Sequence, residues 1–255
     1  MPPLGSTGTL DTMNIPEGLI RRLRQVTRVA VLTGAGISAE SGVPTFRDAR
    51  KGLWEKYQPE ELATPRAFLK NPSLVWEWYA WRRQLVAQAL PNPGHLALVE
   101  LQRRFPEFQL ITQNVDGLHQ RAGSDQVIEL HGNIHRTKCF NEGTLVSTPE
   151  NTRGIPPKCA RCGGFLRPDV VWFEEPLPEE AIERASRASR QCEVFLCIGT
   201  SSVVYPAAGL PLQALKSGAT VIEINPQPTP LTNRAHFVLS GNAGQFLPAL
   251  AEKLV

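Results

Sequence analysis

A glycine-rich turn near the start of the chain is the first feature that could support chemistry. It reads Gly-Ala-Gly-Ile-Ser-Ala over residues 34–39 and follows a short apolar run at residues 29–33. Between a strand and a helix this pattern binds the pyrophosphate of a dinucleotide, because Gly34 permits a tight turn and Gly36 admits phosphate close to backbone N–H groups. A plain dehydrogenase is disfavoured, since no acidic residue for the ribose ends a second strand about 20 residues further on.

Similar apolar runs recur along the chain and predict the strands of one sheet. They cover residues 29–33, 109–112, 127–130, 194–198, 220–224 and 237–239, with helical stretches between them. Helices are expected over residues 16–27, from their apolar spacing, and over residues 73–90, which carry four aromatic side chains. This alternation indicates an α/β fold, with a Rossmann-like parallel sheet and helices on both of its faces.

One segment breaks this alternation. Residues 136–167 hold three of the five cysteines, are rich in Gly, Pro and Thr, and lack a strong apolar period. We interpret them as a small inserted, zinc-ribbon-like module, with part of the helical segment 49–92 packed near it. The Rossmann-like domain then comprises residues 16–135 and 168–255. A flexible N-terminal extension over residues 1–15 precedes it, in which Met13 is an alternative start.

The composition fits a globular domain and argues against several classes of protein. Of 255 residues, 42% are hydrophobic and 20% charged, and no apolar run approaches the roughly 20 residues of a membrane span. The net charge is +3 and the basic residues are scattered, so no dedicated nucleic-acid surface is indicated. An odd number of cysteines without a disulfide spacing, and a start without a secretory signal, indicate the cytoplasm.

Four blocks of sequence together resemble the sirtuin family. Residues 34–48 read Gly-Ala-Gly-Ile-Ser-Ala-Glu-Ser-Gly-Val-Pro-Thr-Phe-Arg-Asp and are similar to the first sirtuin signature. The others are Thr-Gln-Asn-Val-Asp-Gly-Leu-His at 112–119, Leu-His-Gly at 130–132, and Gly-Thr-Ser-Ser at 199–202 with Ile-Asn-Pro at 224–226. The blocks keep the family's order, and the likeness runs from about residue 29 to the C-terminus.

The resemblance implies a site for NAD built from these blocks. One side of the cofactor is expected to contact Gly34, Ala35, Gly36, Phe46 and Arg47. The nicotinamide and ribose pocket is expected to be lined by Gln113, Asn114 and Asp116, and the adenosine half to contact Gly199, Thr200, Ser201, Asn225 and Ala243. Most of these residues follow the carboxyl ends of expected strands, where ligands bind in open parallel sheets.

The resemblance also implies the reaction. In sirtuins the acyl oxygen of a modified lysine attacks the ribose carbon as nicotinamide leaves, and a covalent imidate forms. His131 is then the expected general base, working through the ribose hydroxyls, which suits a group that titrates near neutral pH. Asp116 is expected to accept an N–H of the nicotinamide carboxamide, and Asn114 to position the ribose or a water molecule. The other histidines are interpreted as structural: His95, His119, His135 and His236.

The products implied are nicotinamide, O-acyl-ADP-ribose and free lysine, and the implied partners are proteins with acylated lysines. We expect the enzyme to be a monomer. Two alternative functions use the same cofactor site: a sirtuin-like protein ADP-ribosyltransferase, and a non-catalytic module that binds NAD or acyl-lysine. A zinc-ribbon nucleic-acid binder would need four metal ligands and a basic surface, and the sequence offers neither.

Tyr79 and Arg82 lie three residues apart in the aromatic helix and therefore project from one face of it. They resemble the Tyr-x-x-Arg pair with which one class of sirtuins binds acidic acyl chains. A succinyl carboxylate in an apolar tunnel must be paired, and a guanidinium with a phenol supplies that pairing. Ala39, also typical of that class, is expected to leave room. Desuccinylation and demalonylation are therefore predicted, with some deacetylation.

Sirtuins usually carry two Cys-x-x-Cys pairs around a structural zinc ion. Here Cys159 and Cys162 form one pair, but in the other Cys139 is followed three residues later by Glu142. Two alternatives remain open: Glu142 completes a site of three cysteines and one carboxylate, or the loop is a metal-free remnant. A second departure is Glu174, where the family usually has glycine, in the strand that pairs with the substrate; it is expected to affect peptide preference.

Overall fold

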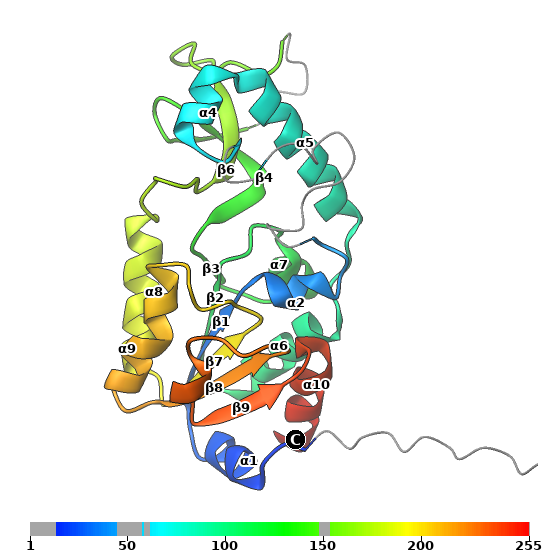
Figure 1. The fold of residues 1–255 in the computed structure, drawn as a ribbon, viewed down its shortest axis with the longest axis vertical. Helices are drawn as coiled ribbons and strands as arrows, with labels where there is room; N and C mark the ends of the chain where they lie inside the picture. Colours follow the sequence, from blue (N-terminus) through cyan, green and yellow to red (C-terminus); the bar gives the residue numbers. More distant parts are fainter. Residues whose placement is uncertain (1–13, 45–57, 59–61, 148–153, 255) are drawn as a thin grey trace, which may run out of the picture.

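The computed structural model describes residues 14–44, 58, 62–147 and 154–254. Six parallel strands form one sheet in the order β3-β2-β1-β7-β8-β9 (Figure 1). The strands are Arg28–Thr33 (β1), Glu107–Thr112 (β2), Ile128–Glu129 (β3), Val194–Ile198 (β7), Thr220–Asn225 (β8) and Phe237–Ser240 (β9). The Rossmann-like parallel sheet is thus confirmed, and each strand overlaps one of the six runs predicted from the sequence.

Helices cover both faces of this sheet. One face packs against α1 (Glu17–Arg24), α6 (Pro93–Arg104) and α10 (Ala243–Leu254), and the other against α8 (Glu179–Gln191) and α9 (Leu210–Lys216) (Figure 1). All five residues of β7 are buried, which explains why its sequence is apolar without alternation. A sheet covered in this way holds the loops at its two ends in fixed positions.

Short helices complete the large domain. They are α2 (Ala35–Ala39), α7 (Leu118–Ala122) and the 3-10 turns η2 (Ala207–Gly209) and η3 (Thr232–Arg234). Near the N-terminus, Ile15 falls within the extension expected to be flexible, but it is buried in the core with α1 and α10. The packed domain therefore starts before residue 16. Within the described ranges, no helix is both long and apolar enough to cross a membrane.

A second, antiparallel sheet lies between β3 and α8 in the chain. Its order is β5-β4-β6, with β4 at Gly132–Cys139, β5 at Leu145–Val146 and β6 at Leu166–Val170. The boundaries expected for the small module, residues 136 and 167, fall inside β4 and β6. Two helices pack beside this sheet, α4 (Pro65–Lys70) and α5 (Pro72–Gln88) (Figure 1). Arg83 connects α5 to β4, because its guanidinium donates hydrogen bonds to the carbonyls of Ile134 at 2.6 Å and Arg136 at 3.0 Å.

The strand order creates a switch point between β1 and β7. From β1 the chain moves outward through β2 to β3, and it later returns to the other side of β1 and moves outward through β7, β8 and β9. The loops that follow β1 and β7 therefore diverge at their carboxyl ends, and ligands of open α/β sheets bind in the crevice between such loops. Those loops begin with Gly34 and Gly199.

Candidate active site

The loops after β1 and β7 contact each other through glycines. The Gly34 N–H donates to the carbonyl of Ile198 at 3.0 Å, and the Gly36 N–H donates to that of Gly199 at 2.8 Å. A Cβ on Gly36 would stand 2.7 Å from the Gly199 Cα, and a Cβ on Gly199 would stand 2.6 Å from the Ile37 nitrogen. The φ of Gly34 is −125°, so no left-handed turn requires glycine there. The close approach of the two backbones requires these glycines, so for Gly34 the reason differs from the tight turn that the sequence predicted.

A buried polar cluster lies beside this turn. Asn114 donates through Nδ2 to the Gly34 carbonyl at 3.0 Å and to Ser38 Oγ at 3.1 Å, which fixes the orientation of its amide. The Ser38 hydroxyl hydrogen-bonds to the Asp116 carboxylate, which also accepts the Leu118 N–H at 2.9 Å. Burial raises the pKa of Asp116, and these two hydrogen bonds oppose that rise. A carboxylate has about four acceptor positions, so Asp116 retains capacity for an amide N–H from a ligand.

His131 lies between β3 and β4, where the two sheets meet. Its Nδ1 is 2.8 Å from the carbonyl oxygen of Gln113. Since a carbonyl only accepts, Nδ1 carries the hydrogen and Nε2 is the basic nitrogen. Burial lowers the pKa of His131, and the bond to Gln113 opposes this effect. An imidazole with a lowered pKa is neutral at pH 7 and able to take up a proton.

The expected cofactor residues gather at the carboxyl edge of four neighbouring strands. They are Gly34, Ala35 and Gly36 after β1, Gln113, Asn114 and Asp116 after β2, Gly199, Thr200 and Ser201 after β7, and Asn225 at the end of β8. Gln113 Nε2 donates to Thr200 Oγ1 at 2.9 Å and so links the loops of β2 and β7. Ala243 is buried at the start of α10. Phe46 and Arg47 lie outside the described residues.

Tyr79 and Arg82 lie buried together on α5. The Tyr79 hydroxyl accepts a hydrogen bond from Trp172 Nε1 at 3.0 Å, and the Arg82 guanidinium lies 5.1 Å from the centre of the Trp78 ring. Burial raises the pKa of Tyr79 to about 12 and lowers that of Arg82, and the two side chains interact electrostatically. A guanidinium and a phenol within an aromatic cluster can both donate hydrogen bonds to a carboxylate, in surroundings that are otherwise apolar.

Ala39 is exposed at the end of α2 and is not among the buried residues that pack around Tyr79. A small residue that does pack into the cluster of Tyr79 is Ala63, which is 3% exposed and whose carbonyl accepts the Phe173 N–H at 2.9 Å. Sequence reasoning missed Ala63, since no apolar period surrounds it. The available signal is the following Thr64, which caps α4 by accepting the Ala67 N–H and marks a helix start beside it.

Three cysteines and one glutamate come together at the end of the small sheet. The ligand atoms of Cys139, Glu142, Cys159 and Cys162 all lie within 4.8 Å of one another, and the sulfurs of Cys139 and Cys162 are 3.5 Å apart. These separations fit tetrahedral zinc, whose bonds to sulfur are about 2.3 Å long. The Glu142 carboxylate lies 3.2 Å from Arg161 Nη2. Cys192 and Cys197 are buried in the separate core cluster with α8 and α9.

Glu174 has a φ of +72°, in the left-handed region that favours glycine. This backbone conformation gives a physical reason for the glycine that sirtuins usually have there. The Glu174 side chain forms an exposed ion pair with Arg66 of α4. The neighbouring Glu175 instead binds Arg167, which is buried, and the Trp172 N–H at 2.8 Å. Glu175 is thus structural, whereas Glu174 presents a charge at the surface.

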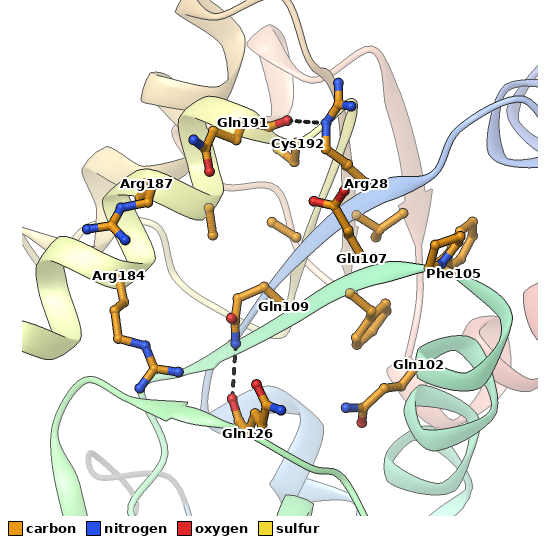
Figure 2. A pocket seen from close by; sticks show the side chains of 15 residues that line it. Arg28, Gln102, Phe105, Glu107, Gln109, Gln126, Arg184, Arg187, Gln191 and Cys192 are labelled. Atoms are coloured by element: carbon orange, nitrogen blue, oxygen red, sulfur yellow. Dashed lines mark hydrogen bonds between the residues drawn. The ribbon is translucent and has the colours of Figure 1, made fainter.

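A pocket of about 470 Å³ opens at the opposite, amino edge of the sheet (Figure 2). Its lining includes Arg28 of β1, Glu107 and Gln109 of β2, and Arg184 and Arg187 of α8. Arg28 and Glu107 are the first residues of strands whose other ends carry the polar cluster. The pocket is therefore separate from the candidate active site, which the glycine contact, the buried polar cluster and His131 define.

Comparisons with known proteins agree with this geometry. Residues 34–206 match the model of the Sir2 family. An NAD-dependent protein deacylase of Aquifex aeolicus is 58% identical over 221 residues, 85% of this chain and 91% of that protein. A solved Sir2 homologue–NAD complex has a TM-score of 0.88 at 47% identity and covers 94% of both chains. A Sir2–p53 peptide–NAD+ complex has a TM-score of 0.80 at 31% identity, over 93% of this chain and 97% of that one. The resemblance read from the sequence is confirmed: this chain belongs to the Sir2 family.

Proposed function

We propose that this protein is an NAD-dependent deacylase of lysine side chains in proteins. The observation that carries the proposal is the meeting of His131, Asn114 and Asp116 at the carboxyl edge of β2 and β3, beside the glycine contact of β1 and β7. The name of the Aquifex aeolicus relative and the NAD in the solved Sir2 homologue complex support it. Acylated-lysine proteins are the proposed partners, and the peptide in the other complex supports this.

The residues present fit a nicotinamide dinucleotide. Asp116 has acceptor capacity for the carboxamide of nicotinamide, and the amide of Asn114 is already oriented by Gly34 and Ser38. When bound, NAD would supply a ribose carbon that accepts the acyl oxygen of the substrate as nicotinamide leaves. His131 would take up the proton of a ribose hydroxyl at Nε2, while the Gln113 carbonyl holds the ring through Nδ1. The protein thus contributes orientation and one proton transfer.

We propose further that the acyl pocket takes succinyl and malonyl chains. The support is the burial of Arg82 beside Tyr79, since a cation held in an aromatic cluster gains most from an acidic ligand. We propose Ala63, in place of Ala39, as a small residue that lines this pocket, and its burial in the cluster of Tyr79 supports this. The position of Glu174 on the surface is proposed to influence the peptide around the lysine.

Replacing Arg82 tests the acyl preference. Arg82→Met is expected to lower kcat/KM on a succinyl-lysine peptide by at least about thirtyfold, because it removes the cation that would pair with the buried succinyl carboxylate. The loss on acetyl-lysine should be far smaller. Arg83→Met is the matched control, since it removes the bonds to Ile134 and Arg136 and should affect both substrates equally. Equal losses in Arg82→Met would contradict the proposed pocket.

The cluster of Cys139, Glu142, Cys159 and Cys162 is proposed to hold a structural zinc ion that closes the end of the small sheet. Its donor set of three sulfurs and one carboxylate supports this assignment. The N–H groups of Cys162 and Arg161 lower the pKa of Cys159, which favours the thiolate that zinc binds. The cytoplasm is the proposed compartment, since free cysteines suit a reducing environment.

A further inference from the structure

Two buried histidines lie side by side behind the candidate active site. His95 of α6 is 0% exposed, His119 of α7 is 1% exposed, and their ring centres are 4.9 Å apart. Among the residues that the structure describes, His95 Nε2 and His119 Nδ1 are buried atoms without a hydrogen-bond partner. Ser124 has a third such atom, its hydroxyl, and its N–H donates to the His119 carbonyl at 3.0 Å. Buried polar atoms destabilise a protein unless a partner satisfies them.

The directions of the hydrogen bonds between His119 and the active site decide which ring nitrogen of His119 carries the hydrogen. The Thr33 hydroxyl donates to Thr112 Oγ1 at 2.8 Å, and Thr112 Oγ1 also accepts the main-chain N–H of Asn114 at 3.0 Å. The single proton of Thr33 is therefore used, and its contact with His119 Nε2 at 2.9 Å must be donated by the imidazole. His119 then carries its hydrogen on Nε2, and its Nδ1 is an acceptor.

A contact with Asn92, on the side away from the active site, decides which ring nitrogen of His95 carries the hydrogen. The Asn92 N–H points to His95 Nδ1 at 3.4 Å as part of the capping box of α6, so the hydrogen of His95 is on Nε2. His95 thus offers a donor where His119 offers an acceptor. Burial lowers the pKa of His95 to about 4 and that of His119 to about 3, the latter with a contribution from His95. Both rings are neutral at pH 7.

We propose that one buried water molecule joins His95 Nε2 to His119 Nδ1 and completes a hydrogen-bond chain that runs through Thr33 to Thr112 Oγ1, the atom that also accepts the main-chain N–H of Asn114. The two ring atoms, one a donor and one an acceptor, supply two of the two to four partners that a buried water needs. His119 and Thr33 are positioning residues, because they act on Asn114 without touching substrate or cofactor. The catalytic value of this hydrogen-bond chain rests on the proposed function. The existence of the hydrogen-bond chain does not depend on it.

Two other histidines support this assignment by holding the same segment. His131 Nδ1 lies 2.8 Å from the carbonyl of Gln113, and His135 Nε2 lies 3.2 Å from that of Asp116. The proposed chain fixes the N–H of Asn114 between them. Three imidazoles would then hold the backbone of residues 113–116, which carries the nicotinamide-pocket side chains.

A pair of Thr33 variants tests the positioning role. Thr33→Val removes the hydroxyl at nearly constant size, and Thr33→Ser keeps it. Thr33→Val is expected to lower kcat about tenfold, the usual effect of losing one buried hydrogen bond, with little change in KM for the acyl peptide. Thr33→Ser should restore kcat to within about twofold of wild type. Wild-type kcat in Thr33→Val, or equal losses in both variants, would overturn the role.

Nitrogen NMR of the histidine rings tests the chain without any activity. Both His95 and His119 are expected to be neutral with hydrogen on Nε2 between pH 6 and 8, and the His95 Nε2–H should show transfer to a long-lived water. His95→Gln and His119→Gln assign the signals. A His119 ring with hydrogen on Nδ1, or no water contact, overturns the proposal. If wild type turns over no acyl-lysine peptide, the proposed function fails while this spectrum still decides the chain.

Discussion

At the scale of single residues, one hydrogen bond decides which nitrogen of His131 is available for chemistry. The Gln113 carbonyl occupies Nδ1, so Nε2 remains free to act as the proposed base. The same peptide segment continues into Asn114, whose side chain is fixed by Gly34 and Ser38. Base and pocket are thus held by adjacent main-chain groups, and small shifts of this segment affect both.

His131→Ala is expected to fold normally and to lose about 100-fold to 10,000-fold in deacylation rate, the usual contribution of a general base. NAD-dependent turnover of an acyl-lysine peptide measures it. His236→Ala is the control, since His236 is exposed near β9 and its loss should leave the rate nearly unchanged. A His131→Ala enzyme with wild-type turnover would refute the role of the base.

The pH dependence follows from the lowered pKa of His131. The base works when neutral, so activity should be full above its pKa and fall as the pH drops through it. Because burial places that pKa below the ordinary value of about 6.5, the acid limb of the kcat/KM profile should lie below pH 6.5. A limb centred above pH 7 would contradict this environment.

Motifs identified the residues proposed to touch ligands, but not those that connect them. His131, Asn114 and Asp116 stand in short family signatures and were found from the sequence alone. Ser38 bridges Asn114 and Asp116 across segments far apart in the chain, and nothing in its own sequence context indicates that link. Ala63 was missed as a neighbour of Tyr79, and Ala39 was proposed instead, because packing between the segment before α4 and α5 is a tertiary contact that no local pattern contains.

At the scale of elements, the contact between the loops of β1 and β7 depends on glycine. Gly199→Ala would add a side chain at a φ of +58° and 2.6 Å from the Ile37 nitrogen. We expect it to lower the free energy of unfolding by at least ~2 kcal/mol and to weaken NAD binding. Gly218→Ala is the matched control, since φ is +85° but no atom lies within 4 Å; it should lower stability by only ~1 kcal/mol. Equal losses, measured by denaturant unfolding, would argue against the backbone contact.

The proposed zinc site of Cys139, Glu142, Cys159 and Cys162 leads to a prediction about the stability of the small sheet. Purified protein should contain one zinc ion per chain, and removal by a chelator should lower the unfolding temperature of the small sheet. Glu142→Cys should bind zinc more tightly than wild type and Glu142→Ala less tightly, because thiolate is the softer ligand. Elemental analysis and competition with a chelator measure this order. Metal-free wild-type protein with unchanged unfolding would support the alternative of a remnant loop.

The sequence predicted the large sheet better than the small one for a physical reason. The six parallel strands are buried runs such as β7, which stand out by composition. The strands of the small sheet are either very short, as β5 is, or polar, as β4 is. Their pairing depends on Arg83 from α5 and on ion pairs of Arg136 with Glu129 and Asp169, contacts that no local pattern contains.

At the scale of the whole molecule, the buried histidine pair links stability to pH. His95 and His119 titrate near 6.5 when unfolded, but near 4 and 3 when folded. The unfolded chain therefore binds more protons below pH 6.5, and stability is retained above that value and falls as the pH drops toward 4. Each histidine should account for a loss of roughly 2 kcal/mol between pH 7 and 5.

Denaturant unfolding of wild type and His119→Gln at the two pH values measures this difference. The variant should lose roughly 2 kcal/mol less than wild type on acidification, since one of the two groups is removed. The variant's lower stability at pH 7 does not matter, because only the change with pH is compared. An identical pH dependence in both proteins would contradict the burial of neutral His119.

The two sheets divide the work of the site between them. The large sheet supplies the switch point with Gly34 and Gly199, and α5 beside the small sheet supplies Tyr79 and Arg82. His131 lies where the chain passes from one sheet to the other, between β3 and β4. This arrangement would let a nucleotide and an acyl chain meet at the imidazole.

The most direct test counts products. The protein is incubated with NAD and a succinyl-lysine peptide, and nicotinamide released is compared with lysine freed, by mass spectrometry. The account predicts one nicotinamide for each lysine freed, turnover at least about 100-fold slower with His131→Ala, and slower turnover of the acetyl-lysine peptide. Nicotinamide released without freed lysine would point to an ADP-ribosyltransferase, and folded protein that turns over no acylated peptide would contradict the account altogether.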